Sequence, residues 1–243
     1  MSFPDFNASD AHIQWQRFCD LSWYHDDLGV WLDISRMHVN ATDLQQLQPR
    51  MDKAFAAMQE LEAGAIANPD EQRQVGHYWL RTPELAPSSE LQQHISREID
   101  LIAAFGRDVI NGTIKAPNGE AFTDVLWIGI GGSGLGPALM IKALQNPGEG
   151  LPFHFFDNVD PNGMSNVLAG LEGRLDRTLV VTVSKSGGTP EPHLGMEQAR
   201  HRLEAAGGQW AGQAVAVTML DSKLDQQAQK EGWLKRFDMF DWV

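Results

Sequence analysis

Two segments rich in glycine and hydroxyl residues could bind a phosphate group. The first, Gly129 to Gly136, holds five glycines and Ser133 within eight residues. Glycine lets the backbone approach a ligand closely and adopt positive φ angles. A helix that starts in such a segment offers unpaired N–H groups and a partial positive charge. The first segment therefore predicts phosphate binding, and its alternative is a tight turn without a ligand.

The second segment, Ser184 to Glu191, places three hydroxyls, two glycines and Lys185 within six residues. Thr189 suits a helix N-cap and Pro190 suits the first helical position. Charge-assisted hydrogen bonds to phosphate oxygens contribute roughly 1.5–3 kcal/mol each, so several would overcome the repulsion from an acidic chain. The alternatives are an ordinary capped helix start, and a Lys185 that points away to pair with a carboxylate.

The first segment also fits a dinucleotide-binding fingerprint, which makes a nicotinamide-dependent oxidoreductase the rival hypothesis. Gly129, Gly131 and Gly134 stand in G-x-G-x-x-G register, and Asp157 lies where a ribose-binding acid is expected. A dinucleotide fold has no evident use for the second segment. Two phosphate-type segments after different strands favour one compact phosphate held between them.

From about residue 120, short apolar runs alternate with helical stretches, which predicts a doubly wound parallel α/β sheet. Ligands of such sheets bind at the carboxyl ends of the strands, where both segments fall. The predicted strands cover 124–130, 153–156, 178–183 and 214–219, and the predicted helices cover 138–144, 162–171, 190–206 and 224–231.

Residues 1–115 show helical spacing and no strand pattern, so we expect an N-terminal helical region that packs on an α/β domain over 116–243. An apolar stripe from Leu44 to Leu61 predicts an amphipathic helix packed on a core. A second helix is expected from Ser89 to about residue 110, after a connector over 68–88. Four tryptophans are expected to be packing residues: Trp15, Trp23, Trp31 and Trp79.

Composition excludes several partners. The formal net charge of −13 disfavours nucleic acid and anionic lipid. One cysteine, Cys19, and the lack of a leader or of an apolar run of roughly 18 residues predict a cytoplasmic protein with no membrane partner. His193 and His201 follow the second segment on a predicted helix, where a catalytic role is the minor alternative, and no Cys/His spacing predicts a metal site.

With these motifs the chain resembles the glucose-6-phosphate isomerase family, in its bacterial form. Residues 129–137 resemble the first family signature, and residues 184–191 resemble the Ser-Lys-Thr/Ser-x-x-Thr-x-Glu loop. Residues 158–160 and 238–243 match two further family segments, so the resemblance covers the whole chain and is most specific from 125 onward.

The resemblance implies roles for individual residues. Gly132 and Ser133 match positions that touch the sugar phosphate. The loop around the phosphate is matched by Ser184, Lys185, Ser186 and Thr189, and supporting positions are matched by Gly131, Gly188 and Glu191. The chain departs from the common eukaryotic pattern at Gly187, Gly188 and Pro190, and Gly188 offers only its backbone where many relatives carry threonine.

The resemblance further implies an aldose–ketose isomerisation through an enediol, without metal or organic cofactor, in a homodimer of chains with two sugar-isomerase (SIS) domains. The family's catalytic base, its ring-opening histidine and its second SIS domain match no part of this chain and are expected beyond Val243. We therefore expect weak sugar-phosphate binding and little turnover. The remaining alternative is a non-catalytic SIS-domain sensor, although the acidic N-terminal region offers no basic recognition helix.

Overall fold

The computed structural model describes residues 3–146 and 148–243. The chain divides into two compact units, unit 1 (Met1–Leu61) and unit 2 (Glu62–Val243). The predicted N-terminal region, residues 1–115, therefore contributes to both units.

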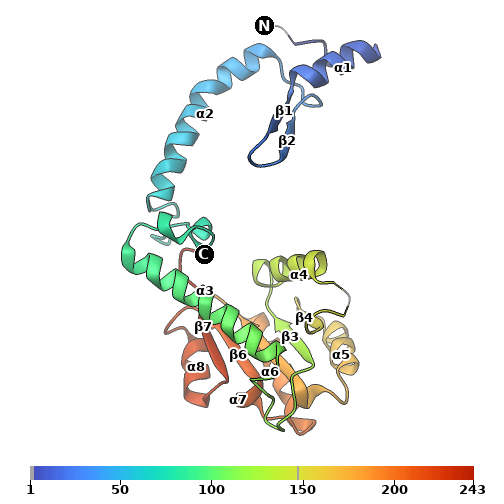
Figure 1. Ribbon diagram of the computed structural model, residues 1–243, viewed down its shortest axis with the longest axis vertical. Helices are drawn as coiled ribbons and strands as arrows, with labels where there is room; N and C mark the ends of the chain where they lie inside the picture. The colour runs from blue at the N-terminus through green and yellow to red at the C-terminus, as the bar shows by residue number, and fades with distance from the viewer. Residues whose placement is uncertain (1–2, 147) are drawn as a thin grey trace. The chain divides into compact units, whose positions relative to one another are not determined.

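Unit 1 holds two helices and a hairpin (Figure 1). Helix α1 (Ala11–Asp20) begins after Asp10, whose carboxylate accepts from the N–H groups of His12 and Ile13. Strands β1 (Ser22–His25) and β2 (Val30–Asp33) pair antiparallel. Helix α2 (Ala41–Glu62) follows and reaches the boundary with unit 2.

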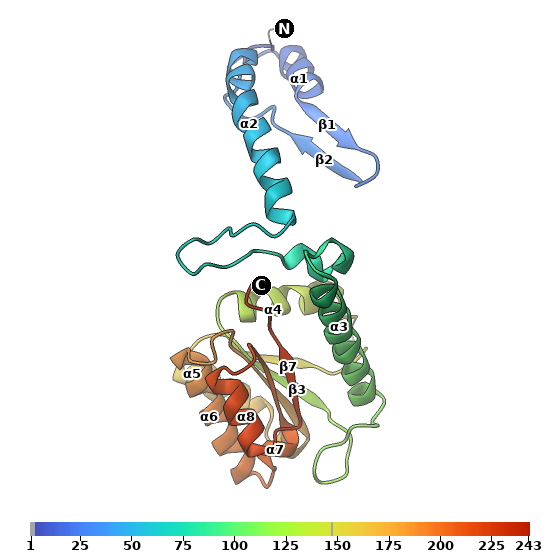
Figure 2. The same cartoon turned by 90° about the vertical axis from the view of Figure 1, so that its left-hand side faces the viewer.

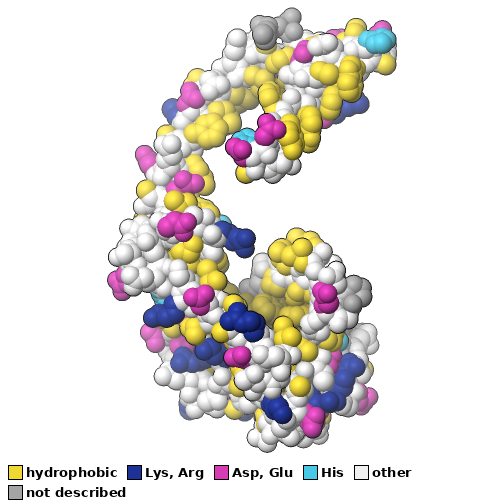
Figure 3. Space-filling view, viewed as in Figure 1, with side chains coloured by type: hydrophobic (Ala, Val, Ile, Leu, Met, Phe, Trp, Pro, Cys, Tyr) yellow, Lys and Arg dark blue, Asp and Glu magenta, His cyan; other side chains and the backbone are white. Residues whose placement is uncertain are grey.

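Three expectations for this region are wrong. The hairpin was not predicted, because its strands are almost wholly exposed and lack an alternation of buried and polar positions. Helix α2 buries none of its residues, although its apolar stripe predicted packing on a core. Trp15, Trp23 and Trp31 are 63%, 48% and 66% exposed, and only Trp79 is a buried packing residue. Yellow side chains accordingly cover much of the visible face of this unit in Figure 3.

Unit 2 contains a five-stranded parallel sheet, which confirms the predicted fold class. The sheet order is β4-β3-β5-β6-β7, and every neighbouring pair is parallel. The strands are β3 (Asp124–Ile128), β4 (Phe153–Phe156), β5 (Thr178–Val183), β6 (Ala214–Thr218) and β7 (Lys235–Asp238). Chain order reverses between β3 and β5, and this switch point is where open α/β sheets bind ligands.

Helices lie on both faces of the sheet (Figure 2). The helices are α3 (Ser89–Ile110), α4 (Gly132–Leu144), α5 (Pro161–Gly170), α6 (Pro190–Ala205), α7 (Trp210–Gln213) and α8 (Lys223–Glu231), with 3₁₀ turns at His77–Leu80, Pro83–Leu85 and Leu175–Arg177. On one face Leu126 and Ile128 pack with apolar residues of α5, α6 and α8. On the other, Val125 and Leu179 pack with Phe105 and Val109 of α3.

The alternation of β3 explains this double burial, because successive side chains of a strand point to opposite faces. Predicted strands and helices of unit 2 agree with the structure to within a few residues, except that α4 begins six residues before the predicted 138. The short helix α7 was not predicted, and neither was the edge strand β7, in which only Phe237 is buried. No helix in the described part of the chain combines the length and apolarity needed to cross a membrane.

Candidate functional site

A cavity of about 620 Å³ opens at the carboxyl ends of β3, β5 and β6 in unit 2. It therefore lies at the switch point of the sheet, where each of the two predicted segments follows the end of a strand. Its wall is formed by Glu71, Arg73, Ile130, Ser133, Val183, Ser184, Lys185, Ser186, Thr189, Pro192, Met219, Leu220, Asp221 and Ser222.

The glycine-rich loop brings Ser133 to this cavity. Gly131 is the N-cap residue of α4 and has a φ of 53°, which favours glycine. Gly134 packs so closely on the loop that a Cβ atom there would lie 2.3 Å from the carbonyl oxygen of Gly129. The indole N–H of Trp127 donates to the carbonyl of Ser133 at 2.7 Å. The backbone of Ser133 is thus fixed, while its hydroxyl makes no hydrogen bond within residues 3–146 and 148–243.

Three hydroxyls of the second loop converge on the cavity. The Ser184 hydroxyl donates to Thr189 Oγ1 at 3.4 Å, and Ser186 Oγ lies at the same distance from Thr189 Oγ1. The N–H of Gly188 donates to Ser186 Oγ at 3.3 Å. These contacts are long for hydrogen bonds between hydroxyls, whose usual length is about 2.7–2.8 Å. Charged phosphate oxygens could therefore accept hydrogen bonds from these donors, and only long, weak hydrogen bonds within the loop would be lost.

A chain of hydrogen bonds fixes the backbone of Ser184 from below. The Thr218 hydroxyl donates its one proton to the carbonyl of Ser184 at 2.6 Å. The Ser222 hydroxyl lies 2.7 Å from Thr218 Oγ1 and must therefore be the donor in that hydrogen bond. The N–H of Asp225 donates to Ser222 Oγ at 3.1 Å. This chain ties the loop after β5 to β6 and to the start of α8.

Helix α6 begins at the cavity with few free donors of its own. Thr189 is its N-cap residue, as expected, but the Thr189 hydroxyl makes no capping hydrogen bond and contacts Ser184 and Ser186 instead. Pro190 and Pro192 in the first turn have no N–H group. Hydroxyls therefore supply much of the hydrogen-bonding capacity on this side of the cavity.

Two cations line the cavity, Lys185 and Arg73. The ammonium of Lys185 donates to the main-chain oxygen of Val243 at 2.6 Å. Burial, followed by the positive charge of Arg73, lowers the pKa of Lys185 below its usual value. Arg73 forms an ion pair with Glu71 at 3.6 Å.

The structure brings together five of the predicted site residues and leaves four outside the cavity wall. Ser133, Ser184, Lys185, Ser186 and Thr189 line it. Gly131 and Gly132 are exposed at the start of α4, Gly188 is exposed beside Ser186, and Glu191 is half-buried in the first turn of α6. His193 and His201 are exposed on α6.

Sequence reasoning missed Glu71, Arg73 and Asp221 as wall residues. Glu71 and Arg73 lie in a segment interpreted as a connector, far from both motifs in sequence. Asp221 has a φ of 59°, which is unusual for a residue other than glycine, but no motif marked it.

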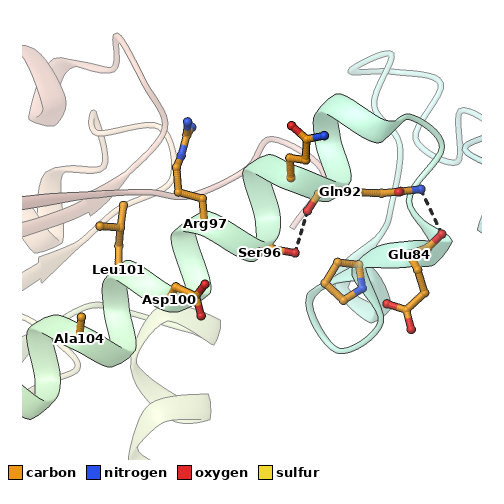
Figure 4. A pocket seen from close by; sticks show the side chains of 9 residues that line it. Glu84, Gln92, Ser96, Arg97, Asp100, Leu101 and Ala104 are labelled. Atoms are coloured by element: carbon orange, nitrogen blue, oxygen red, sulfur yellow. Dashed lines mark hydrogen bonds between the residues drawn. The ribbon is translucent and has the colours of Figure 1, made fainter.

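A second hollow, on α3, is larger but less suited to a ligand (Figure 4). It measures about 750 Å³ and lies between α3 and the turn at Pro83–Leu85. Two of its polar side chains bond to nearby backbone: Gln92 donates to the carbonyl of Glu84 at 3.1 Å, and Ser96 donates to the carbonyl of Gln92 at 2.9 Å. Among the described residues no group of three or more His, Cys, Asp or Glu side chains is placed to hold a metal ion.

The sheet order weighs against the dinucleotide hypothesis. Dinucleotide-binding sheets have the order 3-2-1-4-5-6, in which a third strand lies beyond the second. Here β4 is an edge strand, and β5 lies on the other side of β3. The order is that of flavodoxin-like sheets.

Fold and site together define a doubly wound α/β protein with a pocket lined by hydroxyls and charged residues at its switch point. The sequence profile of the phosphoglucose isomerase family matches residues 33–243. The chain belongs to the phosphoglucose isomerase family.

Individual relatives agree with this assignment. The chain is 99% identical to a glucose-6-phosphate isomerase of Synechococcus sp. (strain CC9605) and 79% identical to one of Synechococcus sp. (strain CC9902), each over 243 residues. The crystal structure of a glucose-6-phosphate isomerase from Chlamydia trachomatis D/UW-3/Cx superimposes with a TM-score of 0.79 at 28% identity and covers 99% of this chain. The chain spans 46% of each of these three proteins.

Proposed function

We propose that this chain forms the phosphate-binding part of an isomerase that interconverts glucose 6-phosphate and fructose 6-phosphate. The observation that carries the proposal is the convergence of Ser133, Ser184, Ser186 and Thr189 on one cavity at the switch point of the sheet. Membership of the phosphoglucose isomerase family supplies the sugar and the reaction class.

In this proposal the chain's residues orient the substrate rather than move its protons. Hydroxyl donors from both loops surround the phosphate, and Gly131, Gly132, Gly188 and Glu191 support the loops. Binding energy at the phosphate positions the distant carbons, where a base transfers a proton through an enediol. The base belongs to the family's second SIS domain in this proposal, so the 243-residue chain turns over little.

We further propose that the functional protein is a cytoplasmic homodimer. An apolar groove of about 690 Å³ between α3, α4 and the sheet supports an association surface. Leu139, Met140 and Leu144 of α4 lie in or beside it and are 67%, 55% and 69% exposed. We expect the purified chain to self-associate, and Leu144→Asp to reduce the associated fraction in light scattering. A stable monomer before any substitution would contradict this part of the proposal.

Calorimetric titration with fructose 6-phosphate tests the site. We expect saturable binding that Ser184→Ala with Thr189→Ala weakens at least about tenfold, since each lost charge-assisted hydrogen bond contributes roughly 1.5–3 kcal/mol. Ser96→Ala, on α3, is the matched control because its hydroxyl bonds only to its own helix.

Two further measurements separate the alternatives. Titration with NAD should give no binding, and tight NAD binding without a response to sugar phosphate would establish the dinucleotide hypothesis. A coupled isomerase assay on the same chain should give a rate near background. A substantial rate would show that residues of this chain transfer the protons.

A further inference from the structure

The turn from Asn68 to Arg73 is a rigid part of the cavity wall. Asn68 and Arg73 form an isolated antiparallel bridge, with N–H to carbonyl distances of 3.0 Å in both directions. The Asn68 side chain accepts from the N–H of Glu71 at 3.1 Å and donates to the Glu71 carboxylate at 3.0 Å. Gln72 completes the turn with a left-handed φ of 55°. The backbone therefore holds Glu71 and Arg73 at the cavity.

Arg73 has unused hydrogen-bonding capacity there. Its guanidinium makes the 3.6 Å ion pair with Glu71, and it makes no hydrogen bond within residues 3–146 and 148–243. The side chain is 29% exposed, so its charge is partly shielded from solvent. Lys185, the other cation of the wall, uses one of its three N–H donors on the main-chain oxygen of Val243. Arg73, with five N–H donors in a planar fork, therefore offers the larger free capacity for a ligand.

Arg73 balances the formal charge of the cavity wall. Two carboxylates, Glu71 and Asp221, and two cations, Lys185 and Arg73, line the cavity and sum to zero. Without Arg73 the sum would be −1, in a chain whose net charge is already −13. A phosphate dianion entering such a cavity would be repelled.

We propose that Arg73 binds the phosphate group of the sugar phosphate directly, and that the phosphate displaces Glu71 as its partner. This inference rests on the proposed function. A planar guanidinium matches two phosphate oxygens at once, which a single ammonium cannot do. Glu71 serves as the counter-charge of Arg73 while the cavity is free of phosphate.

Calorimetric titration of the chain with fructose 6-phosphate and with inorganic phosphate tests this role. We expect Arg73→Gln to weaken both affinities about 10- to 100-fold, with Arg73→Lys in between. The effect should shrink at high ionic strength, because salt screens a partly exposed charge. Arg202→Gln is the matched control, since it removes the same charge from an exposed position in the last turn of α6.

Glu71→Gln separates a binding role from a structural one. It keeps an acceptor for Asn68 and removes the competing charge, so we expect affinity to rise about two- to fivefold. If Glu71→Gln weakened binding as much as Arg73→Gln does, the turn would only support the shape of the cavity and the inference would be overturned.

The remaining outcomes separate this inference from the function on which it rests. Wild-type affinity in Arg73→Gln, together with a loss in the Ser184→Ala and Thr189→Ala double variant, would overturn the role of Arg73 and leave the proposed function standing. A wild-type chain that binds neither sugar phosphate nor inorganic phosphate would overturn both.

Discussion

The two compact units of this chain bury different kinds of residue. Among the described residues of unit 1, those that are buried are Arg17, Leu21 and Ser35. Unit 2 buries three apolar clusters, two of them on opposite faces of its sheet. Unit 1 is therefore organised mainly by hydrogen bonds to one charged side chain, and unit 2 by apolar packing.

Arg17 shows how a unit with so little core can keep one structure. Its guanidinium donates to the carbonyls of Ser35, Pro4, Met37 and Val39 at 2.8–2.9 Å. These carbonyls come from segments before α1 and after the hairpin. A single side chain thus satisfies backbone groups that water would otherwise have to reach.

The largest effect is expected from Arg17→Ala. Each buried carbonyl left without a donor costs roughly 1–3 kcal/mol, four carbonyls lose their donor here, and unit 1 has little apolar burial to offset the loss. Hydrogen exchange should show lost protection in α1 and the hairpin, with unit 2 unchanged. Arg50→Ala, at an exposed position of α2, should leave exchange as it is. Retained protection in Arg17→Ala would show that unit 1 does not depend on this side chain.

Gly187→Ala tests close packing in unit 2. Gly187 has a φ of 64°, and an added Cβ would lie 2.6 Å from the backbone nitrogen of Leu224. We expect a loss of roughly 1–3 kcal/mol in unfolding free energy and weaker phosphate binding. Gly188→Ala is the matched control, because its nearest neighbour would be 3.9 Å away. Equal effects at the two glycines would refute the packing argument.

One carboxyl group in each unit should contribute to stability with an opposite dependence on pH. In unit 1, hydrogen bonds from the side chain and the N–H of Ser35 lower the pKa of Asp33 below 3.8. This stabilisation is present above the unfolded pKa and is lost as pH falls through the lowered one. In unit 2, burial raises the pKa of Asp238 above 3.8 despite the 3.3 Å contact with His94. Burial favours the protonated form of Asp238, and the stability that this form contributes is lost as pH rises through the raised pKa.

Asparagine variants measure this contrast. Asp33→Asn should destabilise unit 1 near neutral pH, and Asp238→Asn should stabilise unit 2 there. Both differences should shrink in strong acid, as followed by hydrogen exchange at several pH values. A destabilised Asp238→Asn at neutral pH would mean that the ion pair with His94 outweighs burial.

The smallest effect is expected from Thr182→Val near the carboxyl end of β5. Thr182 is 1% exposed, and its hydroxyl has no hydrogen-bond partner among the described residues. Valine keeps the shape and removes the unsatisfied group, so stability should stay equal or rise by about 1 kcal/mol. Thr178→Val is the control, because the Thr178 hydroxyl does have a partner and donates to the carbonyl of Arg174 at 2.9 Å. Denaturant unfolding should therefore show a loss of stability in Thr178→Val and none in Thr182→Val. A clear loss in Thr182→Val would indicate a partner such as bound water.

Sequence reasoning worked best where local pattern and tertiary burial agree. The strand over Thr178–Val183 is apolar and β-branched because it is buried along its whole length, so its bounds were predicted correctly. The two loops that line the cavity could be singled out because glycines and hydroxyls mark them locally. The hairpin in unit 1 and strand β7 carry no such pattern, since one is exposed and the other is an edge strand with charged residues.

The cavity could be predicted only in part for a related reason. Ser133, Ser184 and Thr189 follow strands, so sheet topology brings them together. Glu71 and Arg73 reach the same cavity from a turn more than fifty residues before the first strand of the sheet. No periodicity connects that turn to the sheet, and only the folded chain places it there.

The strand order also has a consequence for how the chain folds while it is being synthesised. Once β3 and β4 have paired, each later strand adds to the same growing edge in the order in which it is synthesised, β5, then β6, then β7. Chains emerge from the ribosome amino end first, so this half of the sheet can assemble during translation without rearranging strands already paired. Residues 184–189 follow β5, so they reach their position once β5, the third strand of the sheet in chain order, has paired. Their supports from Thr218 and Ser222 follow only when β6 and α8 emerge.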